Sequence, residues 1–296
     1  MKSFRDLKER LEKLTDRKER DVAKRYALLL KEIQALVSKR YKEYEQDGKL
    51  TYTEMAKYNR LKKLEKDIIR AVNSKETGLR NEIHGHLTDQ YKESYYRTGY
   101  LIETEAEAKA SYTTLRDEVI DEAVNTNFTG LTLNDRLSKR RAELIVNMRE
   151  TIVRGLHEGQ TYSKMIKLIQ NELEGDRAKA QRIVRTEAHR IREAASLNSA
   201  TYAEAKGIIT IKVWNTVKDE RVRERHERLD GVEVNKVDGV FEIDGYTAEA
   251  PSQFGVAELD INCRCYLTYR IEKVKRPKNT RAKELAFAEW QKEMIS

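Results

Sequence analysis

Helix-breaking and cross-linking residues are scarce in this sequence of 296 residues. It has only two prolines, and eight of its thirteen glycines fall before residue 207, so little interrupts a helix over the first two thirds of the chain. Two cysteines cannot form a disulfide framework, and the spacing of Cys263 and Cys265 would strain a bridge between them. We therefore expect long helices and free thiols, as in a protein of a reducing cytosol.

Long apolar runs are also missing. No window approaches the roughly eighteen apolar residues of a membrane-spanning helix, and the opening MKSFRDLKERLEK lacks the apolar core of a signal peptide. The sequence also lacks a glycine-rich phosphate loop, a G-x-S-x-G elbow, an H-E-x-x-H pair and a D-F-G set. These absences predict a soluble protein with no membrane partner, and they argue against the common nucleotide-dependent and protease classes.

What the sequence has in quantity is charge. Charged residues make up 36% of the chain, and the net charge is +8. Residues 1–80 hold 23 Lys and Arg against 14 Asp and Glu, a surplus of +9, which leaves 35 against 36 for the remainder. A localised basic surplus is typical of proteins that bind DNA or an acidic protein surface. A solvated helix carrying Glu–Lys pairs would have the same composition, so both interpretations stay open.

Apolar residues recur at steps of three and four through residues 1–46, which is the pattern of one long amphipathic helix. Thr51 followed by Glu54 has the spacing of a capping box that begins another helix. The two helices would form an antiparallel hairpin that needs a partner surface for its apolar side. The residues expected on the buried face of the second helix are Met55, Tyr58, Leu61, Leu64, Ile68 and Val72.

Residues 76–127 keep the helical pattern and become rich in tyrosine. Tyrosines interleaved with Lys92 and Arg97 could stack on nucleic-acid bases. Tyrosines at helical spacing more often pack against neighbouring helices, and we favour packing. The tyrosines concerned are Tyr91, Tyr95, Tyr96, Tyr100 and Tyr112.

Glycines and turn residues divide the following region into three expected helices. One is expected over 134–157 and another over 163–173. Gly175 should separate the second of these from a final helix that runs to about Lys206. Gly207 is the expected C-cap of that final helix.

The composition changes after Gly207. Residues 208–214 form a β-branched run that ends in a tryptophan, which predicts a strand. Five glycines between 207 and 255 indicate turns that link short strands. Further strands are expected at 240–243 and 263–271.

The sequence therefore predicts an α+β protein: a long, mainly helical N-terminal region, a small α+β module with a short sheet, and a C-terminal helix. Leu285, Ala288 and Trp290 would dock that last helix, whose pattern covers the tail from residue 280 to 295. The expected divisions are a basic helical arm or bundle over 1–127, a helical lead-in over 128–207, the small α+β module over 208–275, and the C-terminal helix over 276–296.

Arg185, Glu187 and Arg190 lie on the last expected helix before the first strand. Glu187 and Arg190 are three residues apart, so they can pair on the helix surface. We expect this group to brace the helix against the small sheet through buried, hydrogen-bonded charges. ADP-ribosylating enzymes also use an Arg and a Glu, but one of each on a helix is weak evidence, since a catalytic glutamate usually lies on a strand or loop.

A dense polar stretch follows the first strand and ends in the turn signal Asp230-Gly231. If the stretch is helical, Asp219, Arg223 and His226 share a face, because offsets of four and three align. Arg221 and Arg223 could then clamp phosphates with their bidentate guanidinium groups. A salt-bridged connector between strands would have the same composition, and the sequence leaves both alternatives open.

His226 and the two cysteines fit a metal site. Residues i and i+2 of a strand project to one face, so Cys263 and Cys265 could converge with the imidazole on a zinc ion. Buried thiols beside a structural histidine are the simpler alternative, and we expect no other cofactor. Zinc usually takes four ligands, and the sequence specifies no fourth; Asp219, Asp230 and His189 are candidates.

These motifs stand in a set order along the chain: IVRTEAHR, then Trp214, then the run DERVRERHERLDG, then INCRC with Asn262 and Arg264. Together they resemble the Mu F-like minor head, or head morphogenesis, proteins of tailed phages, over about residues 128–270. The resemblance implies a virion component, present in few copies in the procapsid, associated with the portal vertex, and acting in head assembly or genome delivery. It carries over no catalytic residue.

We therefore expect a non-enzymatic minor capsid protein that works by binding. Its helices would engage the portal protein, and coat or scaffold protein as further partners, while Lys and Arg of residues 1–80 contact double-stranded DNA without sequence preference. It would lie inside the phage head near the portal, after assembly in the host cytoplasm. The alternative is a metal-dependent nuclease or an ADP-ribosyltransferase-like effector, which would need Glu187, His226 and the two cysteines in one cleft.

Overall fold

A computed structural model of the chain describes residues 3–275 and 278–295. The chain forms two compact units, each assembled from segments that are not contiguous in sequence. The helical unit comprises Arg17–Ile83 and Asn134–Val184. The mixed unit comprises Met1–Asp16, His84–Leu133 and Arg185–Ser296.

Long helices and a small set of short strands confirm the predicted α+β class. Within the described ranges, no helix combines the length and the apolar content needed to cross a membrane. The helices are α1 (Phe4–Tyr44), α2 (Tyr52–Ala56), α3 (Arg60–Ala106), α4 (Asp117–Asn125), α5 (Leu133–His157), α6 (Tyr162–Ala205), α7 (Glu224–Glu227), α8 (Ala257–Asp260), α9 (Thr280–Glu284) and α10 (Phe287–Ile295). The strands are β1 (Ile208–Asn215), β2 (Glu233–Val234), β3 (Phe241–Ile243), β4 (Tyr246–Ala248) and β5 (Tyr266–Val274).

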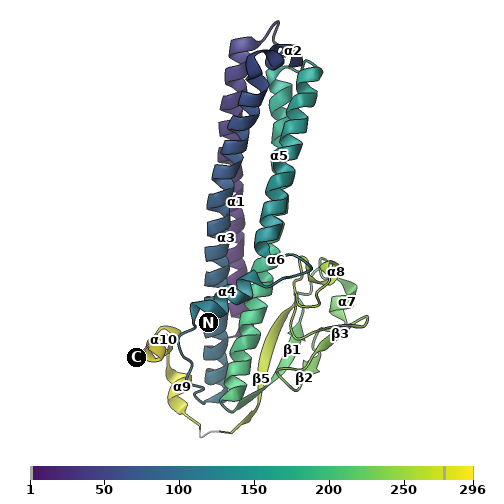
Figure 1. The fold of residues 1–296 in the computed structure, drawn as a ribbon. Coiled ribbons are helices and arrows are strands. Elements are labelled where there is room, and N and C mark those ends of the chain that lie inside the picture. The colour runs from purple at the N-terminus through teal and green to yellow at the C-terminus, as the bar shows by residue number, and fades with distance from the viewer. Residues whose placement is uncertain (1–2, 276–277, 296) are drawn as a thin grey trace. The chain divides into compact units, whose positions relative to one another are not determined.

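In the helical unit, segments of α1, α3, α5 and α6 lie side by side (Figure 1). They bury apolar side chains between them. Along α1 the buried apolar residues of this unit follow steps of three and four, which turn one stripe of the helix inward. The long helix predicted from the periodicity of residues 1–46 is confirmed. The core residues that α1 contributes to this unit are Val22, Tyr26, Leu29, Ile33, Val37 and Tyr41.

The predicted second helix begins as expected and then breaks. Thr51 caps α2, and its hydroxyl accepts a hydrogen bond from the Glu54 N–H at 3.3 Å. Tyr58 and Asn59 then take left-handed φ angles of 53° and 57° before α3 begins. Two such residues turn the chain off the helical path, so the predicted burial of Tyr58 is wrong, and its side chain is 80% exposed. The other residues predicted on that face are buried: Met55, Leu61, Leu64, Ile68 and Val72.

A buried ionic cluster joins all four long helices of the helical unit. Arg140 on α5 donates hydrogen bonds to Glu76 on α3, to Asp176 on α6 and to the Tyr26 hydroxyl on α1. The Tyr26 hydroxyl also donates to Asp176 at 2.5 Å. Burial raises the pKa of the Asp176 carboxyl, although the neighbouring Arg140 guanidinium opposes that rise. Because each helix supplies one member, the cluster fixes the register of the four helices.

Helix α6 runs without a break through Gly175, so the separation predicted at this residue is wrong. A β-carbon at Gly175 would meet no atom within 4 Å, which means that no close contact requires a glycine there. Glycine inside a helix costs only about 1 kcal/mol, and the burial of Leu173 and the ion pair of Asp176 with Arg140 on either side offset that cost. The predicted C-cap is confirmed: Gly207 has a φ of 90°, and its N–H donates to the Glu204 carbonyl at 2.9 Å.

Strand β1 is the middle strand of a three-stranded antiparallel sheet in the mixed unit, in the order β2-β1-β5 (Figure 1). Strands β3 and β4 form a separate hairpin. The strands predicted at 208–214 and 240–243 are confirmed. The strand predicted at 263–271 begins later, at Tyr266, and continues to Val274.

Four of the five tyrosines expected to pack in residues 76–127 are buried against one another, and the fifth, Tyr100, is half-buried against Phe287 and Trp290. Tyr91, Tyr95, Tyr96 and Tyr112 are at most 9% exposed, and the ring of Tyr95 contacts the rings of the other three. The helix predicted through residue 127 is nevertheless interrupted, because residues 107–116 carry no helix between α3 and α4. Burial also rules out these four rings as a platform for stacking nucleic-acid bases.

Glu103 accounts for the path of the chain after α3. Its buried carboxylate accepts hydrogen bonds from the backbone N–H groups of Ala110 at 2.6 Å and Ser111 at 3.0 Å. It also accepts one from the indole N–H of Trp290 at 2.6 Å. Burial raises the pKa of the Glu103 carboxyl. This one side chain therefore fixes both the segment that follows α3 and the tail of the chain.

The tail is two short helices instead of the single helix that its pattern predicts. Leu285 takes an extended backbone between α9 and α10, and its carbonyl accepts a hydrogen bond from the Tyr100 hydroxyl at 2.9 Å. Of the residues expected to dock the tail, Trp290 is buried at 3% exposure, whereas Ala288 is exposed. Docking therefore depends mainly on the indole ring.

We predict that Arg140→Leu destabilises the helical unit by about 3–5 kcal/mol, because it leaves two carboxylates buried without their cation. Urea unfolding followed by far-UV circular dichroism measures this loss. The matched control is Arg149→Leu on the same helix, whose ion pair with Glu65 is exposed on the arginine side and should contribute less than about 1 kcal/mol. Equal losses in the two variants would contradict a structural role for the buried cluster.

Candidate functional site

One face of α6 carries buried polar side chains that hold the loops and strands of the mixed unit. Thr186 accepts a hydrogen bond from the backbone N–H of Asn262 at 3.3 Å, and Glu193 accepts one from the Leu267 N–H at 3.0 Å. Steps of three and four residues place Thr186, His189 and Glu193 on one side of the helix. Buried polar groups that are fully hydrogen-bonded favour one arrangement of the segments they bind.

His189 connects two of these segments. Its Nε2 lies 2.7 Å from the Cys265 carbonyl, and its Nδ1 lies 2.9 Å from the Ser252 hydroxyl. A carbonyl can only accept, so the proton is on Nε2. Burial, with a smaller contribution from nearby Arg192, lowers the pKa of His189 to about 4, which keeps the ring neutral near pH 7. Both ring nitrogens are thus occupied by structural contacts.

Of the group Arg185, Glu187 and Arg190, which we expected to brace the helix against the sheet, Arg190 contacts the end of α4. Glu187 and Arg190 form the expected ion pair at 2.9 Å. The Arg190 guanidinium also donates to the carbonyls of Ala123 at 3.0 Å and Val124 at 3.4 Å, near the end of α4, where helix carbonyls lack internal partners. The pair therefore braces α6 against α4, while the Arg185 side chain is exposed.

The polar stretch after β1 is helical only within α7. Asp219 and Arg223 precede α7, so the condition under which Asp219, Arg223 and His226 would share a helix face is not met. The cause is local: Lys218 takes a left-handed φ of 57°, and the Asp219 carboxylate accepts a hydrogen bond from the Arg221 N–H at 3.1 Å. These two features make a turn where a helix would have to begin.

The side chains of this stretch bind the segment that precedes β5. Arg223 donates to the Ile261 carbonyl at 2.6 Å, and Asp219 pairs with Arg264 at 2.5 Å. Both contacts tie one loop to the other, which favours a salt-bridged connector over a phosphate clamp. Arg221 is exposed and lies outside these two contacts.

The end of the stretch is the turn that its sequence predicts. The Asp230 carboxylate accepts hydrogen bonds from the Thr216 N–H at 2.8 Å and the Thr216 hydroxyl at 3.1 Å. Gly231 has a φ of 81°, and its N–H donates to the Trp214 carbonyl at 2.8 Å. The connector thus leaves and rejoins the same end of β1.

His226, Cys263 and Cys265 come together inside the mixed unit. The His226 Nδ1 lies 3.4 Å from the Cys265 sulfur and 3.6 Å from the Cys263 sulfur. All three residues are at most 5% exposed, and their ligand atoms lie within 4.8 Å of one another. The expected convergence is present, but not for the expected reason, because both cysteines precede β5 instead of lying on it.

None of the three candidates for a fourth ligand joins this cluster. His189 is occupied by Ser252 and Cys265, as described above. Asp219 is paired with Arg264, and Asp230 is held by the Thr216 backbone and Lys218. Among the described residues, the group of His, Cys, Asp and Glu side chains with converging ligand atoms contains only three members.

The two thiols differ in their tendency to ionise. Burial opposes ionisation of Cys263, but hydrogen bonds from Cys265 and His226 outweigh it and lower the pKa of the Cys263 thiol. The neighbouring Cys263 and burial both raise the pKa of Cys265. Without a cation, the pair therefore carries one negative charge more readily than two.

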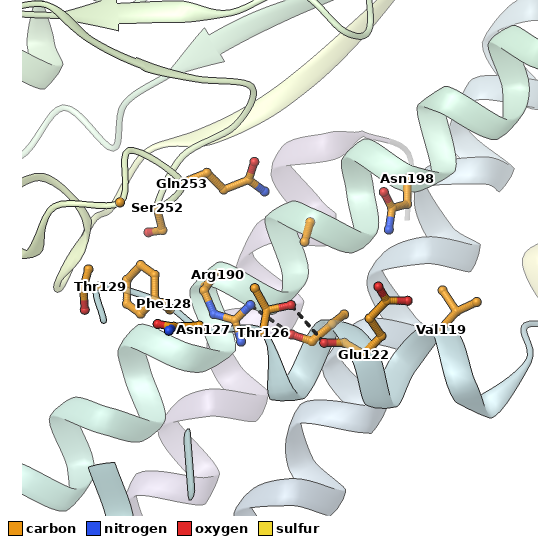
Figure 2. Close-up of a pocket in the computed structure, with 13 residues that line it drawn as sticks. Val119, Glu122, Thr126, Asn127, Phe128, Thr129, Arg190, Asn198, Ser252 and Gln253 are labelled. Atoms are coloured by element: carbon orange, nitrogen blue, oxygen red, sulfur yellow. Dashed lines mark hydrogen bonds between the residues drawn. The ribbon is translucent and has the colours of Figure 1, made fainter. Parts of the chain in front are cut away.

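A cavity of about 510 Å³ opens beside Arg190, also within the mixed unit (Figure 2). It lies between α4, the turn after α4, the nearby part of α6 and the loop around Ser252 and Gln253. The polar side chains at its edge include Glu122 and Asn127. Because the Arg190 guanidinium is already engaged by Glu187 and by backbone carbonyls, it is not a free anion clamp.

Two residues of this region were missed from the sequence. Glu193 had a signal, because it lies seven residues after Thr186, on the same helix face. Lys212 had none: it lies on the buried face of β1 with Thr210 and Trp214, whereas alternation by sequence makes the other face, with Ile209, Ile211 and Val213, the apolar one. It is fully buried, and it donates to the carbonyls of Gly239 at 2.6 Å and Glu249 at 2.8 Å. Burial lowers the pKa of the Lys212 amine to about 8.

Residues 146–268, which include the α6 face, the connector and the buried cluster, match the family model described as phage Mu protein F like protein. The chain is also 32% identical to minor head protein GP7 of Bacillus phage SPP1 over 298 aligned positions, which cover 97% of this chain and 96% of that protein. The chain belongs to the Mu F-like family of phage minor head proteins. The resemblance that the order of the motifs indicates is thereby confirmed.

A second relative of this Mu F-like protein carries the name of an enzyme. The chain is 32% identical over 230 residues to the NAD(+)–arginine ADP-ribosyltransferase EFV of Enterococcus faecalis, strain ATCC 700802 / V583. The match covers 77% of this chain but only 47% of that protein, so more than half of the enzyme lies outside it. No solved structure matches the chain.

We predict that Glu193→Gln changes how the stability of the mixed unit depends on pH. Burial raises the pKa of Glu193 from 4.5 to about 7 in the folded chain. A raised folded pKa gives stability that is present below pH 4.5 and is lost as the pH rises through about 7, a loss of about 3 kcal/mol. Glutamine keeps the acceptor for Leu267 and cannot ionise, so this loss should disappear.

Tryptophan fluorescence during urea unfolding at a series of pH values measures the difference. Both tryptophans, Trp214 and Trp290, belong to the mixed unit, so the signal reports that unit alone. Wild type should lose stability relative to Glu193→Gln between pH 4.5 and 8. Parallel pH profiles for the two proteins would show that Glu193 does not titrate in this range.

Proposed function

We propose that this protein is a minor head protein of a tailed phage, incorporated into the virion head. The observation that carries the proposal is the similarity to minor head protein GP7, which spans 97% of this chain and 96% of that protein. It therefore takes in the long N-terminal helices as well as residues 146–268, where the family model matches. Both the helical unit and the mixed unit have counterparts in a protein named for its place in the head.

The proposed partners inside the head are proteins and DNA. We expect a few copies near the portal vertex, in contact with the portal protein, and we place coat or scaffold protein as further partners during assembly in the host cytoplasm. The helical unit exposes several large apolar side chains that a protein partner would cover. They are Leu28, Tyr52, Tyr58 and Val146.

The distribution of charge between the two units supports DNA binding by the helical unit. Its two segments hold 29 Lys and Arg against 18 Asp and Glu, a surplus of +11. The mixed unit holds the remaining 29 against 32, which is −3, and the two values sum to the net charge of +8. The basic surplus thus follows the folded unit, because residues 134–184 add to the surplus of the N-terminal helices. Basic helical surfaces attract phosphates without reading sequence.

We also propose that the protein acts by binding and not by catalysis. The enzymatic alternative needs Glu187 in a cleft with His226 and the cysteines. Glu187 is 1% exposed and its carboxylate is held by Arg190, and it is not a member of the buried cluster. The similarity to an ADP-ribosyltransferase covers less than half of that enzyme, so its named activity does not follow for this chain.

Quantitative mass spectrometry of procapsids and mature particles from a producing lysate tests the place in the head. We expect a few copies per particle, retained together with the portal protein. Procapsids assembled without the portal protein should lack the protein if the portal recruits it. If the protein were absent from both particle types and free in the lysate, the proposal would be contradicted.

DNA binding is tested by fluorescence anisotropy with a double-stranded oligonucleotide at increasing salt. We expect affinity to fall steeply with salt, because phosphate contacts release counterions. A triple variant in exposed positions of α3, Lys62→Glu, Lys63→Glu and Lys66→Glu, should weaken binding by about tenfold or more and flatten the salt dependence.

The control for this variant reverses three exposed lysines of the mixed unit, at positions 236, 273 and 275. It makes the same change in net charge and should leave most of the affinity in place. If the two triple variants lost equal affinity, the helical unit would not be the DNA-binding surface. A flat salt response in wild type would exclude phosphate binding altogether.

A further inference from the structure

The buried cluster of His226, Cys263 and Cys265 brings one ring nitrogen and two sulfurs within 4.8 Å of one another. Both sulfurs face the same ring nitrogen, Nδ1, at 3.4 and 3.6 Å. Without a metal, Nδ1 exchanges a hydrogen bond with one thiol at a time, and the two cysteines also hydrogen-bond to each other. A cation at the same place would bind all three atoms at once.

The distances fit a tetrahedral zinc ion. Zinc lies about 2.0–2.1 Å from a nitrogen ligand and about 2.3 Å from a thiolate, which separates two such ligands by roughly 3.6 Å in a tetrahedron. The two observed nitrogen–sulfur distances, 3.4 and 3.6 Å, lie close to that edge length. One imidazole and two sulfurs are also a ligand set that suits zinc, whereas magnesium and calcium prefer oxygen ligands.

We propose that His226, Cys263 and Cys265 bind a zinc ion through Nδ1 and the two sulfurs. On binding, each thiol releases its proton to solvent, and two thiolates balance the two positive charges of the ion. The ion, the thiolates and the neutral imidazole then form a group with no net charge, which is compatible with burial. A water molecule would occupy the fourth coordination position of the ion, because no fourth His, Cys, Asp or Glu side chain converges on the group within the described residues.

The surroundings hold the three ligands in place before an ion arrives. His189 binds the Cys265 carbonyl at 2.7 Å, and Arg264, between the two cysteines, pairs with Asp219 at 2.5 Å. The His226 ring lies against the rings of Trp214 and Phe254, each with a centroid distance of 6.2 Å. Its Nε2 has no hydrogen-bond partner among the described residues, and Nδ1 is the ring nitrogen that faces both sulfurs.

Because its three ligands are buried, the ion would act on the fold of the mixed unit. The ion would join α7, in the connector, to the segment that leads into β5. The connector follows the C-terminal end of β1, where Asn215 pairs with Tyr266 at the start of β5. Structural zinc sites contribute directly to folding free energy. The ion would therefore stabilise the mixed unit independently of any role in the phage head.

Metal analysis of the full-length protein, purified without chelators, is the first test. We expect about one zinc ion per chain by inductively coupled plasma mass spectrometry. Replacement by Co²⁺ should give a thiolate-to-cobalt charge-transfer band in the near-ultraviolet and the intense visible bands of tetrahedral cobalt. Folded wild-type protein that contains no zinc and takes up neither ion when they are added would overturn the proposal.

Substitution of the ligands identifies the site. His226→Gln, Cys263→Ser and Cys265→Ser should each lose the metal, whereas His157→Gln, at an exposed histidine of α5 in the helical unit, should retain it. Zinc that stays bound in all three ligand variants would place the ion elsewhere and overturn the assignment. If a ligand variant does not fold, the metal content and cobalt spectrum of wild type still decide the question.

A chelator separates structural binding from adventitious binding. Removal of zinc from wild type should lower the thermal midpoint seen by tryptophan fluorescence, and added zinc should restore it. The midpoint of Cys265→Ser should not respond to either treatment. An unchanged wild-type midpoint after complete removal of the metal would contradict the proposed structural role.

Discussion

A polar side chain that projects from a helix into the protein interior must find a partner, because an unpaired buried charge costs several kcal/mol. In the helical unit, Arg140 satisfies this requirement with groups from three other helices. In the mixed unit, Thr186, His189 and Glu193 of α6 satisfy it with backbone groups of the loops and strands. The apolar cores would tolerate many helix registers, whereas these polar contacts are compatible with one.

The parts of the fold that could be predicted are those that local chemistry decides. The apolar period of α1, the cap at Thr51 and the stop at Gly207 follow from residues within one or two turns of the chain. Gly175 misled the prediction because its cost in a helix is smaller than the packing on either side. The burial of Tyr58 was predicted wrongly because its spacing fits the apolar period of a helix, whereas its backbone is left-handed and interrupts that helix.

In the candidate site, too, some features follow from the local sequence and others depend on contacts between distant segments. The convergence of His226 with the two cysteines could be anticipated from residue types, and the period of α6 held enough information to find Glu193. The orientation of the cysteines could not be anticipated, because it depends on the contact of Arg264 with Asp219 and on the anchoring of Cys265 by His189. Ser252, which faces His189 from a loop, has no local pattern that would single it out.

The interleaving of the two units along the chain sets the order in which they can fold during synthesis. All residues of the helical unit have been made once the ribosome passes Val184. The mixed unit must wait, because Glu103 meets Trp290 across a sequence separation of 187 residues. Until then Tyr91, Tyr95 and Tyr112 have no completed interior to enter, and non-local contacts of this kind form slowly. The residues of the helical unit are thus complete while the tyrosine-rich segments of the mixed unit still lack the tail that closes over them.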